Sequence, residues 1–95
     1  MYVESLDKPE TDPVLVYFNG GPGGATIYLN FYLMGPYVTA DGTSKLYRSN
    51  YSWNRRANLL LIDNPAGIGY SFAENERDFI MSDYQYTRDA LSLIR

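Results

Sequence analysis

The chain contains neither histidine nor cysteine among its 95 residues. Without cysteine it can form no disulfide and no thiolate metal site. Without histidine it lacks the imidazole that accepts the serine proton near neutral pH in a Ser-His-Asp hydrolase. The chain by itself therefore cannot carry out triad chemistry.

Long apolar runs and an excess of positive charge are also missing. The apolar run over residues 59–62 is far too short to span a bilayer. A net charge of −3 and a pI of about 4.7 give no basic surface for nucleic acid or for an anionic membrane. The first eight residues, Met1–Lys8, lack the basic and apolar regions of a signal peptide. We therefore expect no nucleic-acid partner and no membrane segment.

The most informative feature that is present is a glycine-rich run, Asn19-Gly20-Gly21-Pro22-Gly23-Gly24. It follows Val14–Phe18, an apolar stretch without polar alternation, which predicts a strand that is covered on both faces. Glycine loses the most backbone freedom on ordering, so such a run is favoured where backbone N–H groups converge on negative charge. Glycine content alone fits a flexible surface turn equally well.

Strand, loop and helix follow one another twice along the chain. A helix is predicted for 25–34, because apolar residues there precede the stop signal Gly35-Pro36. A short strand is predicted for 37–40, an irregular segment for 45–56, and a second buried strand for 58–63. This order favours an α/β architecture with a mainly parallel sheet.

A second helix is predicted to begin after Ser82. Ser82 and Gln85, three residues further on, form a capping-box pattern. Residues at helical spacing are expected to face the core: Tyr84, Thr87, Leu91 and Ile94. Two helices are too few to cover both faces of a sheet of buried strands. We therefore expect residues 1–95 to form one partial domain, truncated at both ends, with an incomplete sheet.

Four short motifs follow one another along the chain. Asn19–Gly23 reads N-G-G-P-G, residues 33–37 resemble E-L-G-P-F, residues 50–54 resemble N-P-Y-S-W-N, and residues 57–72 resemble A-N-V-L-F-L-D-S-P-A-G-V-G-F-S-Y. Together they resemble the N-proximal part of a serine carboxypeptidase, a family with the α/β-hydrolase fold. The resemblance covers nearly the whole chain, and it implies that the glycine run is an oxyanion loop after an inner strand of the sheet.

The resemblance implies roles for three residues of this loop. Gly21 would donate its backbone N–H to the oxyanion of the tetrahedral intermediate, while Asn19 and Gly20 would bind the free C-terminal carboxylate of the substrate. No member of the Ser/Asp/His triad would lie in this chain, because the family's G-E-S-Y-A-G motif and its later aspartate and histidine come further on. No metal and no organic cofactor is implied.

The activity implied at family level is hydrolysis through an acyl-enzyme that releases C-terminal amino acids from peptides. The partners would be peptide or protein C-termini and the remainder of the parent domain, and the 95-residue chain alone is expected to be inactive. The family enters the secretory pathway and reaches the vacuole, the lysosome or the outside of the cell.

One departure from the family pattern keeps other functions open. Leu33 stands where the family has a glutamate that helps to hold the substrate carboxylate. A non-catalytic binding or structural descendant, or an acyltransferase of the same family, fits this replacement as well.

Three further positions need separate interpretation. Ser71, within Gly69–Ala73, imitates a nucleophile elbow, but Asn64-Pro65 separates it from the preceding strand, so we do not expect a nucleophile there. The resemblance implies that residues 63–67 shape one wall of the active-site cleft, and Asp63 is expected to cap a loop rather than to act as a catalytic acid. Asn50-Tyr51-Ser52 is a glycosylation sequon, for which the neighbouring tryptophan predicts partial burial.

Overall fold

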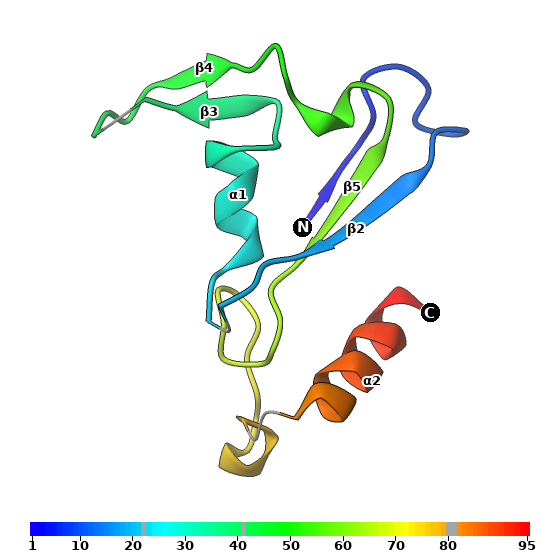
Figure 1. Ribbon diagram of the computed structural model, residues 1–95, viewed down its shortest axis with the longest axis vertical. Helices are drawn as coiled ribbons and strands as arrows, with labels where there is room; N and C mark the ends of the chain where they lie inside the picture. The colour runs from blue at the N-terminus through cyan, green and yellow to red at the C-terminus, as the bar shows by residue number, and fades with distance from the viewer. Residues whose placement is uncertain (22, 41, 80–81) are drawn as a thin grey trace.

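The computed structural model describes residues 1–21, 23–40, 42–79 and 82–95. Within these ranges a small sheet, a hairpin and two α-helices form a mixed α/β structure (Figure 1). The strands are β1 (Tyr2–Val3), β2 (Val14–Phe18), β3 (Tyr37–Thr39), β4 (Leu46–Arg48) and β5 (Asn58–Ile62). The helices are α1 (Thr26–Tyr32) and α2 (Asp83–Ile94), with single 3-10 turns at Trp53–Arg55 and Glu76–Phe79. No helix in the described ranges is both long and apolar enough to cross a membrane.

The three-stranded sheet has the order β1-β5-β2 and is partly parallel. β2 runs parallel to β5, with Val14 opposite Asn58 and Phe18 opposite Ile62, whereas β1 pairs with β5 in the antiparallel direction. Both predicted apolar strands are therefore present, and they are neighbours. Among the described residues, however, β2 is the edge strand and β5 the inner one, so the expectation that the glycine loop follows an inner strand is not met in this sheet.

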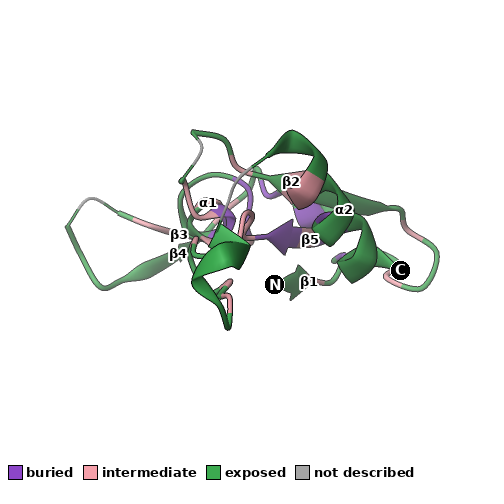
Figure 2. Cartoon of the chain, turned by 90° about the horizontal axis from the view of Figure 1, so that it is seen from below, coloured by how far each residue is buried: buried purple, intermediate pink, exposed green. Residues whose placement is uncertain are grey.

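Burial separates these two strands. Leu59 and Leu61 of β5 are each 1% exposed, and they form the core together with the fully buried Met34 (Figure 2). The prediction that β2 is covered on both faces is wrong for this chain, because every residue of β2 except Tyr17 is exposed. The apolar pattern of β2 is that of a buried strand, but the described chain supplies no layer to cover it.

The region from α1 to β4 forms a compact corner next to the sheet. The predicted helix is confirmed, and it ends when the Leu33 and Met34 amides both turn back to the Leu29 carbonyl at 3.0 Å. Gly35 then packs so closely that a Cβ would overlap the Asn30 carbonyl. The predicted strand at 37–40 is confirmed as β3. The irregular segment expected over 45–56 is wrong in part, because residues 46–48 pair with β3 as β4.

Helix α2 begins where the capping pattern placed it, and Ser82 Oγ accepts a hydrogen bond from the Gln85 amide at 3.2 Å. The predicted core-facing side is wrong: Tyr84 is 78% exposed, and Thr87, Leu91 and Ile94 are exposed as well. Ala90 is the buried residue of this helix. Figure 1 gives the reason, because α2 lies apart from the sheet and no other helix or strand of the described ranges covers its remaining sides.

Candidate functional site

The glycine loop begins at the carboxyl end of β2, and its backbone needs glycine. Gly21 has φ of 133° and Gly23 has φ of 114°, values that residues with a side chain rarely adopt. A Cβ at Gly21 would also meet the amide nitrogens of Gly23 and Gly24 at 3.3 Å. Pro22, which belongs to the predicted motif, lies outside the described residues.

Polar contacts brace the two ends of this loop. The Asn19 amide donates to the hydroxyl of the fully buried Thr26 at 2.8 Å, which ties the end of β2 to the first turn of α1. The Asn19 side chain also bonds to the next residue, because its Oδ1 accepts from the Gly20 amide at 2.9 Å. Its Nδ2 reaches the Ala25 carbonyl at 3.5 Å, which is a long and weak contact.

The backbone N–H of Gly21 has no such partner. It donates no hydrogen bond to any residue that the structure describes, and Gly21 itself is exposed. A backbone donor that is left unpaired can bind an oxygen of a ligand. The Gly20 amide, by contrast, must first break its hydrogen bond to Asn19 Oδ1 before it can bind an oxygen of a ligand.

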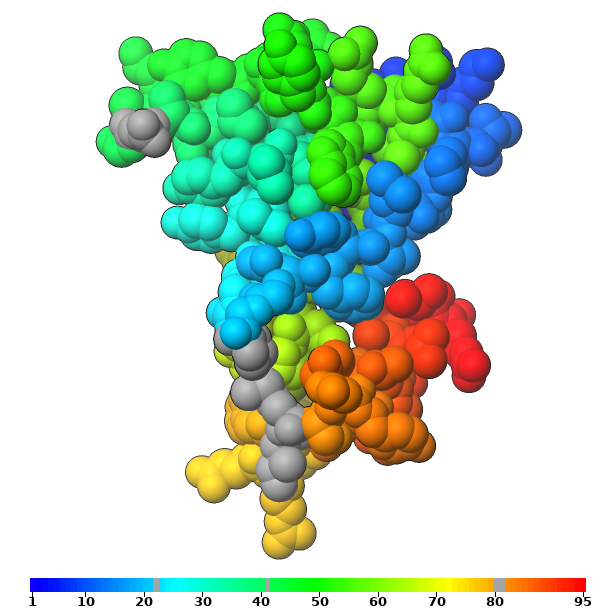
Figure 3. Space-filling view, in the orientation of Figure 1, coloured from blue at the N-terminus to red at the C-terminus, as the bar shows by residue number. Residues whose placement is uncertain are grey.

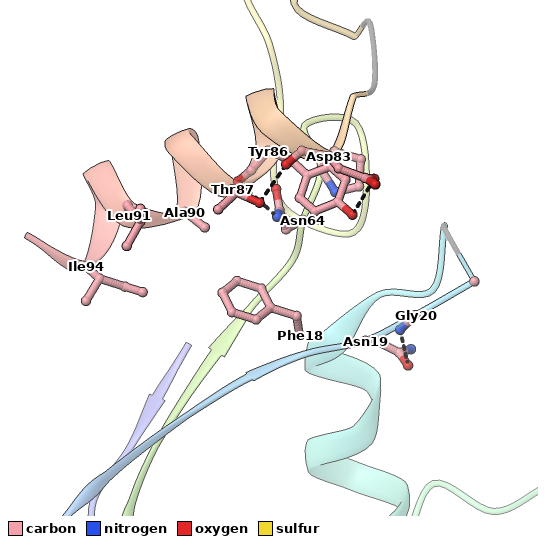
Figure 4. A pocket seen from close by; sticks show the side chains of 12 residues that line it. Phe18, Asn19, Gly20, Asn64, Asp83, Tyr86, Thr87, Ala90, Leu91 and Ile94 are labelled. Carbon is pink, nitrogen blue, oxygen red and sulfur yellow. Dashed lines mark hydrogen bonds between the residues drawn. The ribbon is translucent and has the colours of Figure 1, made fainter.

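The loop forms one wall of a cleft with a volume of about 770 Å³ (Figure 4). Asn19, Gly20 and Gly21 all line it, so the structure brings the three predicted residues together. Phe18 lies beside them with its ring pointing toward α2, and Asn64 and Pro65 line the cleft as well. The opposite wall is one side of α2, formed by Asp83, Tyr86, Thr87, Ala90, Leu91 and Ile94.

Among the described residues that line the cleft, Asp83 supplies the one carboxylate. Asp83 Oδ1 accepts a hydrogen bond from the Tyr86 hydroxyl at 2.9 Å, and this bond raises the pKa of Tyr86. No lysine or arginine is among the described residues that line the cleft. An anion bound there would therefore rely on backbone N–H groups and the Asn19 carboxamide rather than on a cationic side chain.

Asp63 lies at the end of β5, and its carboxylate holds two loops together. Its Oδ1 accepts from the Ile27 amide in α1, and its Oδ2 accepts from the Tyr70 amide, both at 3.0 Å. Gly69 packs against this carboxylate with φ of 57°, where a Cβ would overlap the oxygens. The prediction that Asp63 caps a loop is confirmed.

Ser71 and Leu33 both lie outside the cleft. The Ser71 hydroxyl donates to the Asp63 carbonyl, and in a chain without histidine it has no imidazole to activate it. Its position agrees with the prediction that Ser71 is not a nucleophile. Leu33 caps α1 with 57% of its surface exposed and does not line the wall formed by residues 19–21.

The resemblance to the family placed residues 63–67 on one wall of the cleft, and Asn64 and Pro65 do line it. The carboxyl ends of adjacent parallel strands meet at the same edge of a sheet, which brings the loops after β2 and β5 side by side. Sequence reasoning missed Phe18 and the contribution of α2 to the cleft. The side that α2 presents depends on tertiary packing and had no comparable signal.

The chain is similar to serine carboxypeptidases along its whole length. The model of the family described as serine carboxypeptidase matches residues 1–95. A serine carboxypeptidase of Caenorhabditis elegans is 48% identical over 73 residues, which are 76% of this chain and 12% of that protein. The venom serine carboxypeptidase of Apis mellifera is 42% identical over 89 residues, and serine carboxypeptidase-like 44 of Arabidopsis thaliana is 34% identical over 91 residues. The latter two matches cover 93% and 95% of this chain but 19% of each relative, so the chain spans about a fifth of their length or less.

Proposed function

The chain belongs to the serine carboxypeptidase family, and we propose that it is the part of such an enzyme that binds the substrate carboxylate and the oxyanion. The whole enzyme would release C-terminal amino acids from peptides through an acyl-enzyme. The observation that carries this proposal is that Asn19, Gly20 and Gly21 line one wall of a single cleft. A glycine loop at the carboxyl end of a parallel strand is also where α/β proteins place their ligands.

Gly21 is the proposed oxyanion donor. Its N–H has no partner among the described residues, and Gly21 lines the cleft. A donor that is oriented before the reaction stabilises the developing charge without reorganisation, and the loss of one such donor lowers kcat about 10²- to 10³-fold.

Asn19 and Gly20 are the proposed carboxylate binders. In the unliganded loop they satisfy each other, because the Asn19 Oδ1 accepts from the Gly20 amide. A substrate carboxylate would accept hydrogen bonds from the Gly20 N–H and from an N–H of Asn19 Nδ2. The present contact of Asn19 Nδ2 to the Ala25 carbonyl, at 3.5 Å, is weak. Hydrogen bonds to an ionised acceptor are stronger than the neutral bonds that they replace.

The nucleophile and the base would come from the rest of the parent domain. This chain has no histidine, and it spans about a fifth of its relatives or less. The free edge and exposed faces of β2 offer a surface on which further strands and helices could pack. We also propose passage through the secretory pathway, which is supported by one relative that is named for venom.

A chimeric enzyme tests this function. The 95-residue chain replaces the matching segment of the venom serine carboxypeptidase of Apis mellifera. Hydrolysis of an N-blocked dipeptide with a free carboxyl end is then measured. We expect turnover that a serine-directed reagent abolishes, and none from the 95-residue chain alone. A chimera that folds, by circular dichroism and size, yet releases no amino acid would contradict the proposal.

An acyltransferase is the second candidate, and Leu33 is the observation that favours it. An exposed apolar side chain replaces a group that would share a proton with the substrate carboxylate. The same chimera separates the two functions: ester formation with an added alcohol that outpaces hydrolysis supports the acyltransferase. A peptidase would instead hydrolyse preferentially.

A further inference from the structure

The segment between β4 and β5 carries the sequon Asn50-Tyr51-Ser52, which the proposed function does not use. Sequence reasoning predicted that it would be partly buried, but Asn50 is exposed and Tyr51 is 89% exposed. Trp53, from which that burial was inferred, is itself 47% exposed. Ser52 alone is buried. The acceptor position therefore lies on an exposed turn.

The fold holds this turn firmly and points it outward. The Ser49 amide donates to the Pro36 carbonyl and the Trp53 amide to the Met34 carbonyl, each at 2.8 Å, so both ends of the turn are tied to the corner after α1. Arg55 Nη1 donates to the Asn50 carbonyl at 3.0 Å. The Asn50 side chain, in contrast, makes no hydrogen bond to any residue that the structure describes.

We propose that Asn50 is an acceptor for an N-linked oligosaccharide. The co-reactant is a lipid-diphosphate-linked oligosaccharide, and the transferase recognises an asparagine followed at the second position by a hydroxyl residue, here Ser52. A bond forms between Asn50 Nδ2 and the anomeric carbon, the bond from that carbon to the diphosphate oxygen breaks, and the amide proton passes to a base of the transferase. The proposal rests on the secretory route proposed above.

The buried Ser52 is compatible with this reaction. Transfer takes place on the extended chain as it enters the lumen, and at that stage the hydroxyl is accessible. The folded protein has only to leave room at Asn50, and the exposed turn does so. In the family pattern N-P-Y-S-W-N a proline follows the asparagine and blocks transfer, whereas Tyr51 follows it here.

The position of the turn also keeps a bulky glycan away from the cleft. The segment that joins β4 to β5 lies at one end of the long axis of the molecule, at the top of Figures 1 and 3. The glycine loop and α2, which line the cleft, lie toward the other end. An oligosaccharide on Asn50 would therefore leave the proposed carboxylate and oxyanion sites open.

The test is translation of the full 95-residue chain behind a cleavable signal sequence in the presence of microsomes. Only the chain that is protected from added protease is scored, so every scored molecule has reached the lumen. We expect a slower-migrating band that a peptide N-glycosidase removes and that is absent in Asn50→Gln. Ser52→Ala should abolish the band as well, and it breaks no hydrogen bond that the structure describes, since the Ser52 hydroxyl is unpaired.

Two matched variants make the result decisive. Ser49→Ala changes a neighbouring serine but leaves the sequon intact, so the band should persist. Arg77→Ser creates a second sequon at the exposed Asn75, so it should add a second glycan and report that the transferase is competent on this chain. Glycosylation of Asn75 without glycosylation of Asn50 would overturn the proposal. Because the signal sequence is supplied, this result is independent of whether the chain serves a carboxypeptidase.

Discussion

At the scale of single residues, the candidate site works mainly through its backbone, and side chains hold that backbone in shape. Asn19 is an example, because its Oδ1 accepts from the amide of the next residue, Gly20, while its Nδ2 makes only a weak contact to Ala25. Asp63 is a purely structural counterpart, since its carboxylate bonds to two backbone amides. The sequence motif identified these residues, but the bracing bond inside the loop could not be read from it, because it depends on the conformation of the loop.

Asn19 Oδ1 bonds to the Gly20 amide, and Asn19 Nδ2 is the proposed donor to the substrate carboxylate. A substitution in the chimeric enzyme can separate these two functions. Asn19→Asp keeps the oxygen that braces Gly20, but it replaces the donor by a negative charge where the substrate carboxylate would bind. Losing a hydrogen bond to a charged group costs about 1.5–3 kcal/mol. We therefore expect KM for a free-carboxyl peptide to rise at least about tenfold, while kcat changes little. An unchanged KM would exclude Asn19 from carboxylate binding.

Asp12 gives a prediction about pH. Hydrogen bonds from the Ser5 hydroxyl at 2.5 Å and from the Lys8 amide at 3.0 Å hold the pKa of Asp12 below its usual value. A lowered pKa in the folded state means that Asp12 adds stability above the pKa of the unfolded chain and that this contribution is lost as the pH falls through the folded value. Titration of the Asp12 carboxyl carbon by NMR should give the low pKa, and Ser5→Ala should raise it. An identical pKa in both proteins would contradict the assignment.

At the scale of elements, strands and helices were predicted well and their surroundings poorly. The strands β2 and β5 and the start of α2 followed from local apolar runs and from a capping serine. The sequence did not predict that the faces of β2 are exposed, or which side of α2 is buried. An apolar pattern indicates which residues a strand or helix can bury, but not whether another layer covers them. β4 was missed since its pairing with β3 is a tertiary contact.

The difference in packing between β5 and α2 predicts a difference in hydrogen exchange. β5 is paired on both edges and buried, whereas α2 packs through Ala90 and through a 3.4 Å bond from Asn64 Nδ2 to the Tyr86 carbonyl. Amides of β5 should therefore exchange most slowly and those of α2 much faster.

Ser82→Ala should speed exchange in α2 by the equivalent of about 1 kcal/mol through loss of the N-cap.

Ser92→Ala is the matched control for this cap. Ser92 lies near the other end of α2, and its hydroxyl only bonds back to the Arg88 carbonyl. Its removal should leave the protection of α2 unchanged or slightly higher, because alanine favours a helix. Equal effects of the two serine substitutions would show that Ser82 does not cap the helix.

At the scale of the whole molecule, the chain exposes apolar surface on a strand at the edge of its described sheet. Val14, Leu15, Val16 and Phe18 are between 37% and 53% exposed on an edge strand. Uncovered apolar faces next to an unpaired edge favour association between chains. The exposed faces of β2 therefore predict that the isolated chain is only marginally stable.

Sedimentation of the isolated chain tests this view. We expect an average mass that rises with concentration, and Val16→Lys should lower it by placing a charge in the middle of the edge strand. Tyr51 is more exposed than Val16 but does not belong to the sheet, so Tyr51→Lys should change the average mass little. A monomeric chain with a single cooperative thermal transition would contradict the prediction.

The central claim is that the Gly21 N–H stabilises the oxyanion, and the kcat of the chimeric enzyme with Gly21→Ala tests it most directly. A Cβ at Gly21 strains a backbone with φ of 133° and meets the amides of Gly23 and Gly24 at 3.3 Å, so we expect the loop that carries the donor to shift. Gly42→Ala is the control, because it has a similarly unusual φ of 67° in open space. We predict that Gly21→Ala lowers kcat by about 10²- to 10³-fold with little change in KM, and that Gly42→Ala leaves kcat unaltered. A Gly21→Ala enzyme that folds and keeps the full kcat would contradict the account.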